Sequence, residues 1–489
     1  MIRHLKLVRW LPTVLVIFST VPRWATAGEK DSKPLALHPD NPHYFVFQGK
    51  PAFLITSGEH YGAVLNKEFN YALYLDELRA RGFNLTRTFS GTYREIPGSF
   101  KIVENTLAPE RENYVCPWAR SATPGAGDGG NKFDLKTFNQ AYFERLKDFV
   151  AQAGKRGIVV ELVLFCTIYD DKLWAVNPMK LGNNVQNVGN VDRREVSTLA
   201  SKQLTEVQEA LVRKIVRELK DFDNLYYEVC NEPYFGGVTQ AWTDRMVEVI
   251  QDAEKDLPAK HLIAQNIANG TKKIDKPNPG VSIFNFHYAT PPDAVRENYG
   301  LNKVLADDET GFRGKGDLHY RTEAWDFLLA GGAVYSNLDY SFTVKQPGGT
   351  AVVTTSPGGG GPELRRQLQV LKEFLGGFDF VKMRPNNAVL KGGILKSVSL
   401  SSGEPAEARV TARALVETGK AYAIYIRGGS QIDLAVDLPA GTYRAEWVNT
   451  RSGKVEKKDE VKPLGRDSIL SSPKYAEDIA LRIVRVTKK

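Results

Sequence analysis

Two glutamates stand where a carboxyl group could take part in a reaction. Glu232 lies in NLYYEVCNEPYFGG, residues 224–237, where an apolar run typical of a buried strand stops at Asn231-Glu232-Pro233. Glu309 lies in VLADDETG, residues 304–311, at the end of a second such run. Glutamate is almost never fully buried unless it is paired. Each residue therefore either marks the exit of a strand into water or serves a chemical purpose.

Two facing carboxyl groups suit the hydrolysis of a glycosidic bond. With retention of configuration, the two groups lie about 5–5.5 Å apart; one attacks the anomeric carbon, and the other protonates the leaving oxygen and later activates water. We expect partial burial to raise the pKa of Glu232, which favours the protonated acid. Asp308 is an alternative to Glu309 as the attacking group. Glu161 and Glu228 also lie on predicted strands, and we interpret both as structural partners of a lysine or arginine.

Alternating apolar strands and amphipathic helices occupy residues 52–376. Eight strands are predicted near residues 54, 86, 162, 229, 263, 284, 305 and 336, and a helix follows nearly every one, the sixth being weakly marked. Eight such units predict a TIM barrel, (β/α)8, within residues 28–380. A barrel places its active site at the carboxyl ends of the strands. Polar residues collect there, including His60, Arg87, His287, Tyr288 and Tyr340.

Two predicted loops on this face are long, residues 91–132 and 167–198. Long loops at the active end of a barrel often shape a binding cleft. Trp118 and Trp174 lie in them and could stack on sugar rings, or could instead hold their own loops in place.

The last hundred residues differ in character. Short alternating strands separated by turn residues fill 388–489 and predict a small antiparallel β-sandwich domain. Tyr425, Tyr443 and Trp447 could form a carbohydrate-binding face, but packing in the domain core is the favoured interpretation.

The first 27 residues read as a cleavable signal peptide. Basic residues precede an apolar stretch that is too short to span a bilayer, and the small residues at 25–27 form a cleavage site. We therefore expect a secreted or periplasmic protein that has no membrane span. Residues 1–27 hold four basic residues and no acidic one, so the net charge of +8 falls to +4 without them. No basic cluster is dense enough to predict nucleic-acid binding.

Nothing in the sequence calls for a metal or a cofactor. The three cysteines, Cys116, Cys166 and Cys230, do not follow zinc spacing, and their odd number leaves at least one thiol free. A metal-dependent barrel hydrolase needs several histidines at strand ends, and only His60 and His287 are suitably placed.

YEVCNEP followed by LADDETG resembles the clan A retaining glycoside hydrolases, notably the cellulase-like family 5. The resemblance implies a β-glycosidase acting on a polysaccharide or oligosaccharide without a cofactor. It makes Glu232 the acid/base and Glu309 the nucleophile, while Asn231 contacts the sugar 2-hydroxyl. Arg87 would orient the nucleophile, Tyr288 would hydrogen-bond it, and His287 would line the site. The family separates its sixth-strand His and Tyr by one residue and usually ends its eighth strand with Trp; FHYA and SNLDYSF differ from that pattern. The alternative is a non-catalytic carbohydrate-binding protein built on a degenerate barrel.

Overall fold

The computed structural model describes residues 33–353, 357–391, 410–463 and 467–486. The predicted signal peptide and a predicted strand at 392–400 lie outside these ranges. A search of the described part of the chain finds no helix with the length and apolar character needed to cross a bilayer.

Eight parallel strands form the central sheet, in the order β4-β13-β12-β11-β10-β9-β8-β5. The Phe89 N–H donates to the Tyr61 carbonyl (3.1 Å) and the Asn84 N–H to the Ile55 carbonyl (3.3 Å), so the two end strands meet and nearly close the barrel. All eight predicted strands are confirmed. They are β4 (Leu54–Gly58), β5 (Leu85–Phe89), β8 (Val159–Cys166), β9 (Leu225–Asn231), β10 (Ile263–Asn269), β11 (Ile283–His287), β12 (Val304–Glu309) and β13 (Val334–Leu338).

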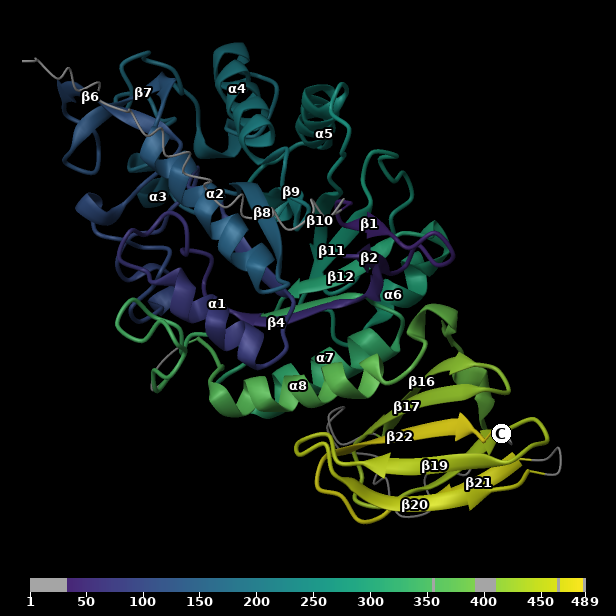
Figure 1. The fold of residues 1–489 in the computed structure, drawn as a ribbon. Helices are drawn as coiled ribbons and strands as arrows, with labels where there is room; N and C mark the ends of the chain where they lie inside the picture. Colours follow the sequence, from purple (N-terminus) through teal and green to yellow (C-terminus); the bar gives the residue numbers. More distant parts are fainter. Residues whose placement is uncertain (1–32, 354–356, 392–409, 464–466, 487–489) are drawn as a thin grey trace, which may run out of the picture. The chain divides into compact units, whose positions relative to one another are not determined.

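Helices lie outside this ring of strands (Figure 1). The 18-residue α4 shows why they form: its Leu204, Leu211 and Ile215 recur at helical spacing on one buried face, and the Ser201 side chain accepts a hydrogen bond from the Leu204 N–H at its start. The short α6 is the weakly marked sixth helix. The helices are α1 (Tyr71–Ala80), α2 (Gln140–Lys155), α3 (Asp171–Ala175), α4 (Lys202–Leu219), α5 (Gln240–Glu254), α6 (Asp293–Asn298), α7 (Asp317–Leu329) and α8 (Pro362–Gly376).

The barrel strands are buried on both faces. Every residue of β8 and β9 is buried, including the charged Glu161 and Glu228. Parallel strands of this kind are near-continuous apolar runs. Any ionisable side chain on them therefore needs a partner inside the barrel.

The long segment after β5 contains more structure than the predicted loop. A hairpin of β6 (Trp118–Pro124) and β7 (Asn131–Phe138) extends from it, and the Gly-rich stretch 124–130 makes the turn. The expectation of an irregular loop over 91–132 is wrong there, because alternating residues such as Phe133 and Leu135 are buried on one face of β7. A small sheet of β1 (Ala36–Leu37), β2 (Phe45–Phe47) and β3 (Lys50–Ala52) precedes the barrel.

An antiparallel β-sandwich follows the barrel. One sheet has the order β14-β16-β17-β22-β19-β20 and the other β15-β18-β21. Tyr443 and Trp447 are fully buried in the core of this domain, which confirms the core-packing interpretation for them. Tyr425 is also fully buried, but it stacks on Trp325 of α7, with ring centroids 5.3 Å apart. The strands are β14 (Arg384–Pro385), β15 (Leu390–Lys391), β16 (Thr411–Glu417), β17 (Ala421–Arg427), β18 (Asp433–Asp437), β19 (Tyr443–Val448), β20 (Val455–Val461), β21 (Asp467–Ser471) and β22 (Asp478–Arg485).

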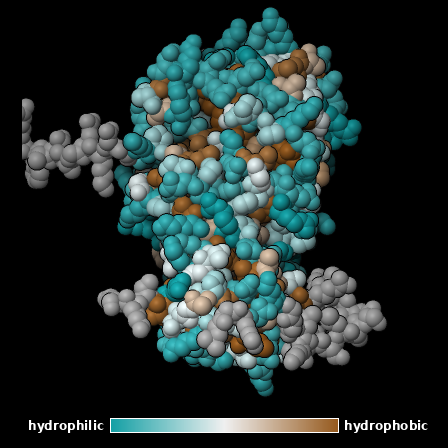
Figure 2. All heavy atoms as spheres, turned by 90° about the vertical axis from the view of Figure 1, so that its right-hand side faces the viewer, coloured by the Kyte–Doolittle hydropathy of each residue, from teal (hydrophilic) through white to brown (hydrophobic). Residues whose placement is uncertain are grey.

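The surface is mixed in character. On the face drawn in Figure 2, hydrophilic residues predominate and hydrophobic ones lie scattered among them. Such a surface agrees with the near balance of acidic and basic residues in the sequence.

Candidate active site

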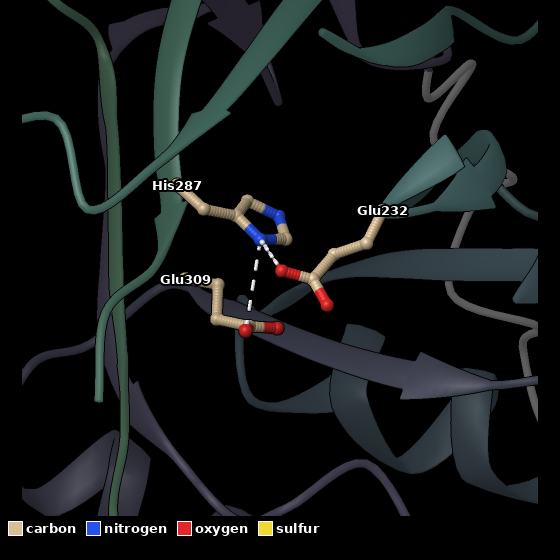
Figure 3. Close-up of side chains that lie close together, drawn as sticks. All are labelled: Glu232, His287 and Glu309. Atoms are coloured by element: carbon tan, nitrogen blue, oxygen red, sulfur yellow. Dashed lines mark ion pairs between the residues drawn. The ribbon is translucent and has the colours of Figure 1, made fainter. Parts of the chain in front are cut away.

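The structure brings the two glutamates together. Glu232 directly follows β9 and Glu309 ends β12, and their side chains approach from opposite sides of the barrel with His287 between them (Figure 3). A carboxylate oxygen of each glutamate and a ring nitrogen of His287 all lie within 4.8 Å of one another. Both glutamates are buried, at 7% and 5% exposed.

A register shift in the sheet lets consecutive acidic residues reach the same imidazole ring. Phe286 pairs with Asp307, but the next residue, His287, pairs with Glu309, so Asp308 is an additional residue in β12. Such a bulge re-aims side chains that would otherwise alternate between faces. As a result Asp308 lies 3.2 Å from Nε2 of His287, and Glu309 lies 3.6 Å from Nδ1.

Left-handed backbone conformations direct three side chains into the site, including that of Glu232. Tyr61, Glu232 and Tyr288 have φ values of 58°, 48° and 53°. Non-glycine residues in this region cost about 1–3 kcal/mol each and cluster at functional sites. The turn at Tyr288 explains how an adjacent His-Tyr pair serves one site: both His287 and Tyr288 contact Glu309, although neighbours on a regular strand point to opposite faces.

Three donors converge on the Glu309 carboxylate. The Tyr61 hydroxyl donates to Oε2 (2.8 Å), an Arg87 guanidinium N–H donates to the same oxygen (3.2 Å), and the Tyr288 hydroxyl donates to Oε1 (3.2 Å). An ionised carboxylate accepts hydrogen bonds and donates none. The surroundings of Glu309 therefore suit a charged carboxylate held in a fixed orientation.

Glu232 has a different set of partners. It accepts hydrogen bonds from the hydroxyls of Tyr169 and Tyr234 and lies 3.4 Å from Nδ1 of His287. Burial raises the pKa of this carboxyl group, but His287 and the two tyrosines lower it by more, so the net pKa is below the usual value. The predicted rise in the pKa of Glu232 is therefore wrong, because these contacts outweigh burial.

His287 is the reason for that reversal. Burial alone would lower its pKa, but the carboxylates of Glu309, Asp308 and Glu232 surround the ring and raise its pKa well above the usual range. The surrounding carboxylates thus favour the imidazolium form of this ring, which faces both candidate catalytic groups.

Arg87 organises the floor beneath this trio. Its guanidinium makes a bidentate contact with Glu228, from Nε to Oε2 (2.9 Å) and from Nη2 to Oε1 (2.9 Å). It also donates to the Asn231 side-chain oxygen (2.7 Å) and lies 3.8 Å from Glu161. Burial and the nearby acids Asp308 and Glu228 raise the pKa of Glu161 well above its usual value. Glu161 and Glu228 are therefore structural partners of an arginine, as predicted.

Two groups of three side chains could offer metal ligands among the described residues: Glu232, His287 and Glu309, and Glu161, Glu228 and Asp308. The first group contains His287, whose pKa the surrounding carboxylates raise, and the Arg87 guanidinium contacts all three acids of the second. We assign no metal to either group, because the protein itself offers positive charge to offset the carboxylates.

A cavity of about 60 Å³ opens onto the catalytic pair. Of the residues predicted to bind substrate, His60, Asn231 and Tyr288 line this cavity, and Tyr340 lies beside it, 6.0 Å from the His60 ring and 6.3 Å from Phe312. The lining residues are His60, Tyr61, Phe89, Tyr93, Glu95, Phe100, Leu107, Tyr169, Asn231, Glu232, Tyr288, Glu309, Phe312 and Leu338.

Arg87 and His287 were also predicted to bind substrate; they contact Glu309 but do not line the cavity. The two predicted tryptophans do not reach the cavity. Trp118 is 1% exposed on β6, and Trp174 is 4% exposed and donates its indole N–H to the Val191 carbonyl (3.2 Å). Neither lines the cavity, because both pack within their own loops, the alternative given for them above.

Sequence reasoning did not assign four residues that the structure places at the site: Tyr61, Tyr169, Tyr234 and Glu95. Tyr61, Tyr169 and Tyr234 each lie within three residues after the end of a barrel strand, which is a usable signal. Glu95 lies in the long segment after β5 and carries no such signal.

Comparison with known proteins agrees with this geometry. The model of the family Cellulase (glycosyl hydrolase family 5) matches residues 53–310, more than half of the chain. The search of curated proteins found no match. A solved structure described as a glycoside hydrolase is 14% identical, with a TM-score of 0.62 over 94% of this chain and 98% of that one. A glycoside hydrolase family 5 protein from Bacteroides vulgatus ATCC 8482 is 13% identical, with a TM-score of 0.60 over 92% and 93%. At such identities these two structures support the fold. The match to the family model covers the strands that carry both glutamates, and the chain belongs to the cellulase family, glycosyl hydrolase family 5.

Proposed function

We propose that this glycoside hydrolase cleaves β-glycosidic bonds of a polysaccharide or a derived oligosaccharide with retention of configuration. The observation that carries the proposal is the approach of the Glu232 and Glu309 carboxylates to within 4.8 Å. Retaining enzymes hold their carboxyl groups about 5–5.5 Å apart, whereas inverting enzymes need about 6.5–9.5 Å to admit a water between them. The predicted signal peptide is the basis for our proposal that the enzyme works outside the cytoplasm.

In the first step, Glu309 attacks the anomeric carbon and the bond to the leaving oxygen breaks. Tyr61, Arg87 and Tyr288 hold the attacking carboxylate in place. Glu232 gives a proton to the leaving oxygen. Entry of a sugar removes the remaining water from the Glu232–His287 pair, and loss of solvation disfavours an ion pair relative to its neutral form. The proton of His287 then moves to Glu232, from which it is transferred.

In the second step, Glu232 acts as the base. Having lost its proton, it takes one from a water molecule, and the resulting hydroxide attacks the anomeric carbon of the ester on Glu309. The Glu309 carboxylate leaves, and its three donors receive the restored charge. The proton that Glu232 took from water then returns to His287, and the reaction ends with both glutamates and the imidazole in their original states.

Removal of each carboxyl group separates the two roles. Glu309→Gly should abolish turnover, and azide should partly restore it on an activated aryl β-glycoside, giving a glycosyl azide of inverted configuration. Glu232→Ala should lower the rate far more for natural glycosides than for aryl glycosides with good leaving groups, because only the former need protonation.

The matched control is Glu206→Ala on α4, where the side chain is 62% exposed. This variant should retain wild-type rates. Near-normal hydrolysis of a polysaccharide by either catalytic variant, or a glycosyl azide of retained configuration, would overturn the assignment.

A further inference from the structure

Glu232 and Glu309 lie at a small cavity, whose volume is about 60 Å³. Clefts that take drug-sized ligands have volumes of about 300–1,000 Å³. An enzyme that cuts within a polymer needs an open groove through which the chain runs on both sides of the catalytic pair.

Two phenylalanines form the roof of this cavity. Phe100, from the segment after β5, and Phe312, from the segment after β12, meet edge to face with ring centroids 6.4 Å apart. Phe100 also packs against Tyr169 (5.3 Å), and Phe312 against Tyr340 (6.3 Å). The two phenylalanines are 40% and 44% exposed on their outer sides.

The roof is held in a strained conformation. Phe100 and Phe312 have φ values of 52° and 53°, in the left-handed region that bulky residues rarely adopt. The contact between the two rings narrows the mouth of the cavity.

A buried ion pair forms part of the wall. Nε2 of His60 lies 3.2 Å from the Glu95 carboxylate, which also accepts hydrogen bonds from Tyr93 and Asn105. Both members line the cavity, and His60 Nδ1 has no hydrogen-bond partner among the described residues. Buried polar atoms are nearly always paired. A hydroxyl group can both donate to Glu95 and bond to His60, so a sugar would complete this wall.

Resting on the proposed function, we infer that this site is a pocket for one sugar unit and that the enzyme removes single neutral sugars from chain ends. The His60–Glu95 pair binds hydroxyl groups of that terminal sugar. The cavity encloses the sugar that is transferred to Glu309.

The charges of the lining select a neutral sugar. Three carboxyl groups line the cavity, those of Glu95, Glu232 and Glu309, and among its described lining residues only His60 can be cationic. A sugar that carries a carboxylate, such as a uronic acid, would meet like charge in a site of low dielectric constant. Such repulsion is severe at short range.

The products released first give the test. Cello-, manno- and xylohexaose labelled with 2-aminobenzamide at the reducing end are incubated with the wild type, and labelled products are separated by size early in the reaction. The inference predicts free monosaccharide and a labelled product one unit shorter. Labelled fragments of intermediate length among the first products would overturn it. Failure to hydrolyse any hexaose or any 4-nitrophenyl β-glycoside would instead contradict the proposed function on which the inference rests.

Variants test the His60–Glu95 wall and the phenylalanine roof separately. Glu95→Gln should lower kcat/KM for the preferred neutral 4-nitrophenyl glycoside by about 10- to 100-fold, as expected for loss of a hydrogen bond to a charged group, and should reduce the preference for that glycoside over the 4-nitrophenyl glucuronide. An unchanged preference would overturn the role of Glu95 in sugar binding, because damage to folding alone lowers both rates equally.

The Phe100→Ala/Phe312→Ala double variant opens the roof. It should release labelled fragments of intermediate length that the wild type does not release. Ile469→Ala, which removes a side chain that is 70% exposed on β21, is the control and should leave the product pattern unchanged. A double variant with the wild-type pattern would show that the phenylalanines do not restrict the site to chain ends.

Discussion

Asp308→Asn offers a sharp test of how the proton for catalysis is held. The Asp308 carboxylate lies 3.2 Å from Nε2 of His287 and is one of three carboxylates that raise the pKa of that ring. The pKa of Asp308 itself is lowered, since Arg87 and His287 outweigh its burial. Asparagine keeps the shape of the side chain and removes the charge. The variant should therefore weaken the hold of His287 on its proton.

The size of the effect follows from this one contact. An opposite charge within about 4–6 Å shifts a pKa by about 1–3 units. The pKa of His287 should thus fall by about 1–3 units when this ion pair is removed. Because the active enzyme needs one proton on the Glu232–His287 pair, the alkaline limb of the kcat/KM profile should move to lower pH by a similar amount.

The assay is kcat/KM against pH for the aryl β-glycoside that the wild type hydrolyses best. Asp307→Asn is the matched control: this neighbour is equally buried, but among the described residues the ion pairs of His287 are with Glu232, Asp308 and Glu309 and not with Asp307. Its replacement by a neutral residue should leave the alkaline limb in place. An unchanged alkaline limb of the pH profile in folded Asp308→Asn, or an equal shift in both variants, would show that Asp308 does not hold the proton on His287.

Three further predictions concern other contacts. Tyr61→Phe removes a 2.8 Å hydrogen bond to Glu309 and should lower kcat/KM by about 10- to 100-fold. Its control is Tyr142→Phe, which should not lower kcat/KM, because the buried Tyr142 hydroxyl has no partner among the described residues. Equal rates in both variants would contradict the role of Tyr61. Burial raises the pKa of Glu323 from 4.5 to about 7, so the folded state keeps this proton to higher pH than the unfolded state does. The free energy of unfolding should therefore fall by about 3 kcal/mol as the pH rises from 4.5 to about 7. In Glu323→Gln, urea unfolding should show this fall removed, and an unaltered slope would contradict it. Trp174→Phe should lower the unfolding temperature without changing KM, and a raised KM at unchanged stability would restore Trp174 as a sugar contact.

The barrel and its catalytic ends could be predicted because both follow from simple periodic rules. Strands such as β8 are continuous apolar runs, and the parallel order brings the ends of β9 and β12 to one rim. That rule alone placed Glu232 and Glu309 in one site. It needs no knowledge of side-chain contacts.

Departures from regular backbone hid the rest of the site. The bulge that brings Asp308 onto His287 leaves no mark in LADDETG, and the left-handed turn at Tyr288 is not signalled by its residue type. The pKa of Glu232 was predicted in the wrong direction for the same reason. Burial was foreseeable, but the charge of His287 depends on Asp308, whose position depends on the bulge.

Long loops were the other gap. The sequence shows that Trp118 follows β5 at a distance, but not that a hairpin turns its ring into the core. Glu95 lies in the same segment and reaches the cavity, although nothing in its neighbourhood distinguishes it from the exposed Glu110. Residue type alone does not decide which loop side chains face a site.

The most direct test of the central claim is to trap the covalent intermediate. The wild type is incubated with a panel of 2,4-dinitrophenyl 2-deoxy-2-fluoro-β-glycosides, digested with trypsin and analysed by mass spectrometry. The account predicts one glycosyl group on the peptide VLADDETGFR, residues 304–313, with fragmentation placing it on Glu309. Attachment to Asp308 or Glu232, or release of dinitrophenol with no adduct at any time, would contradict it.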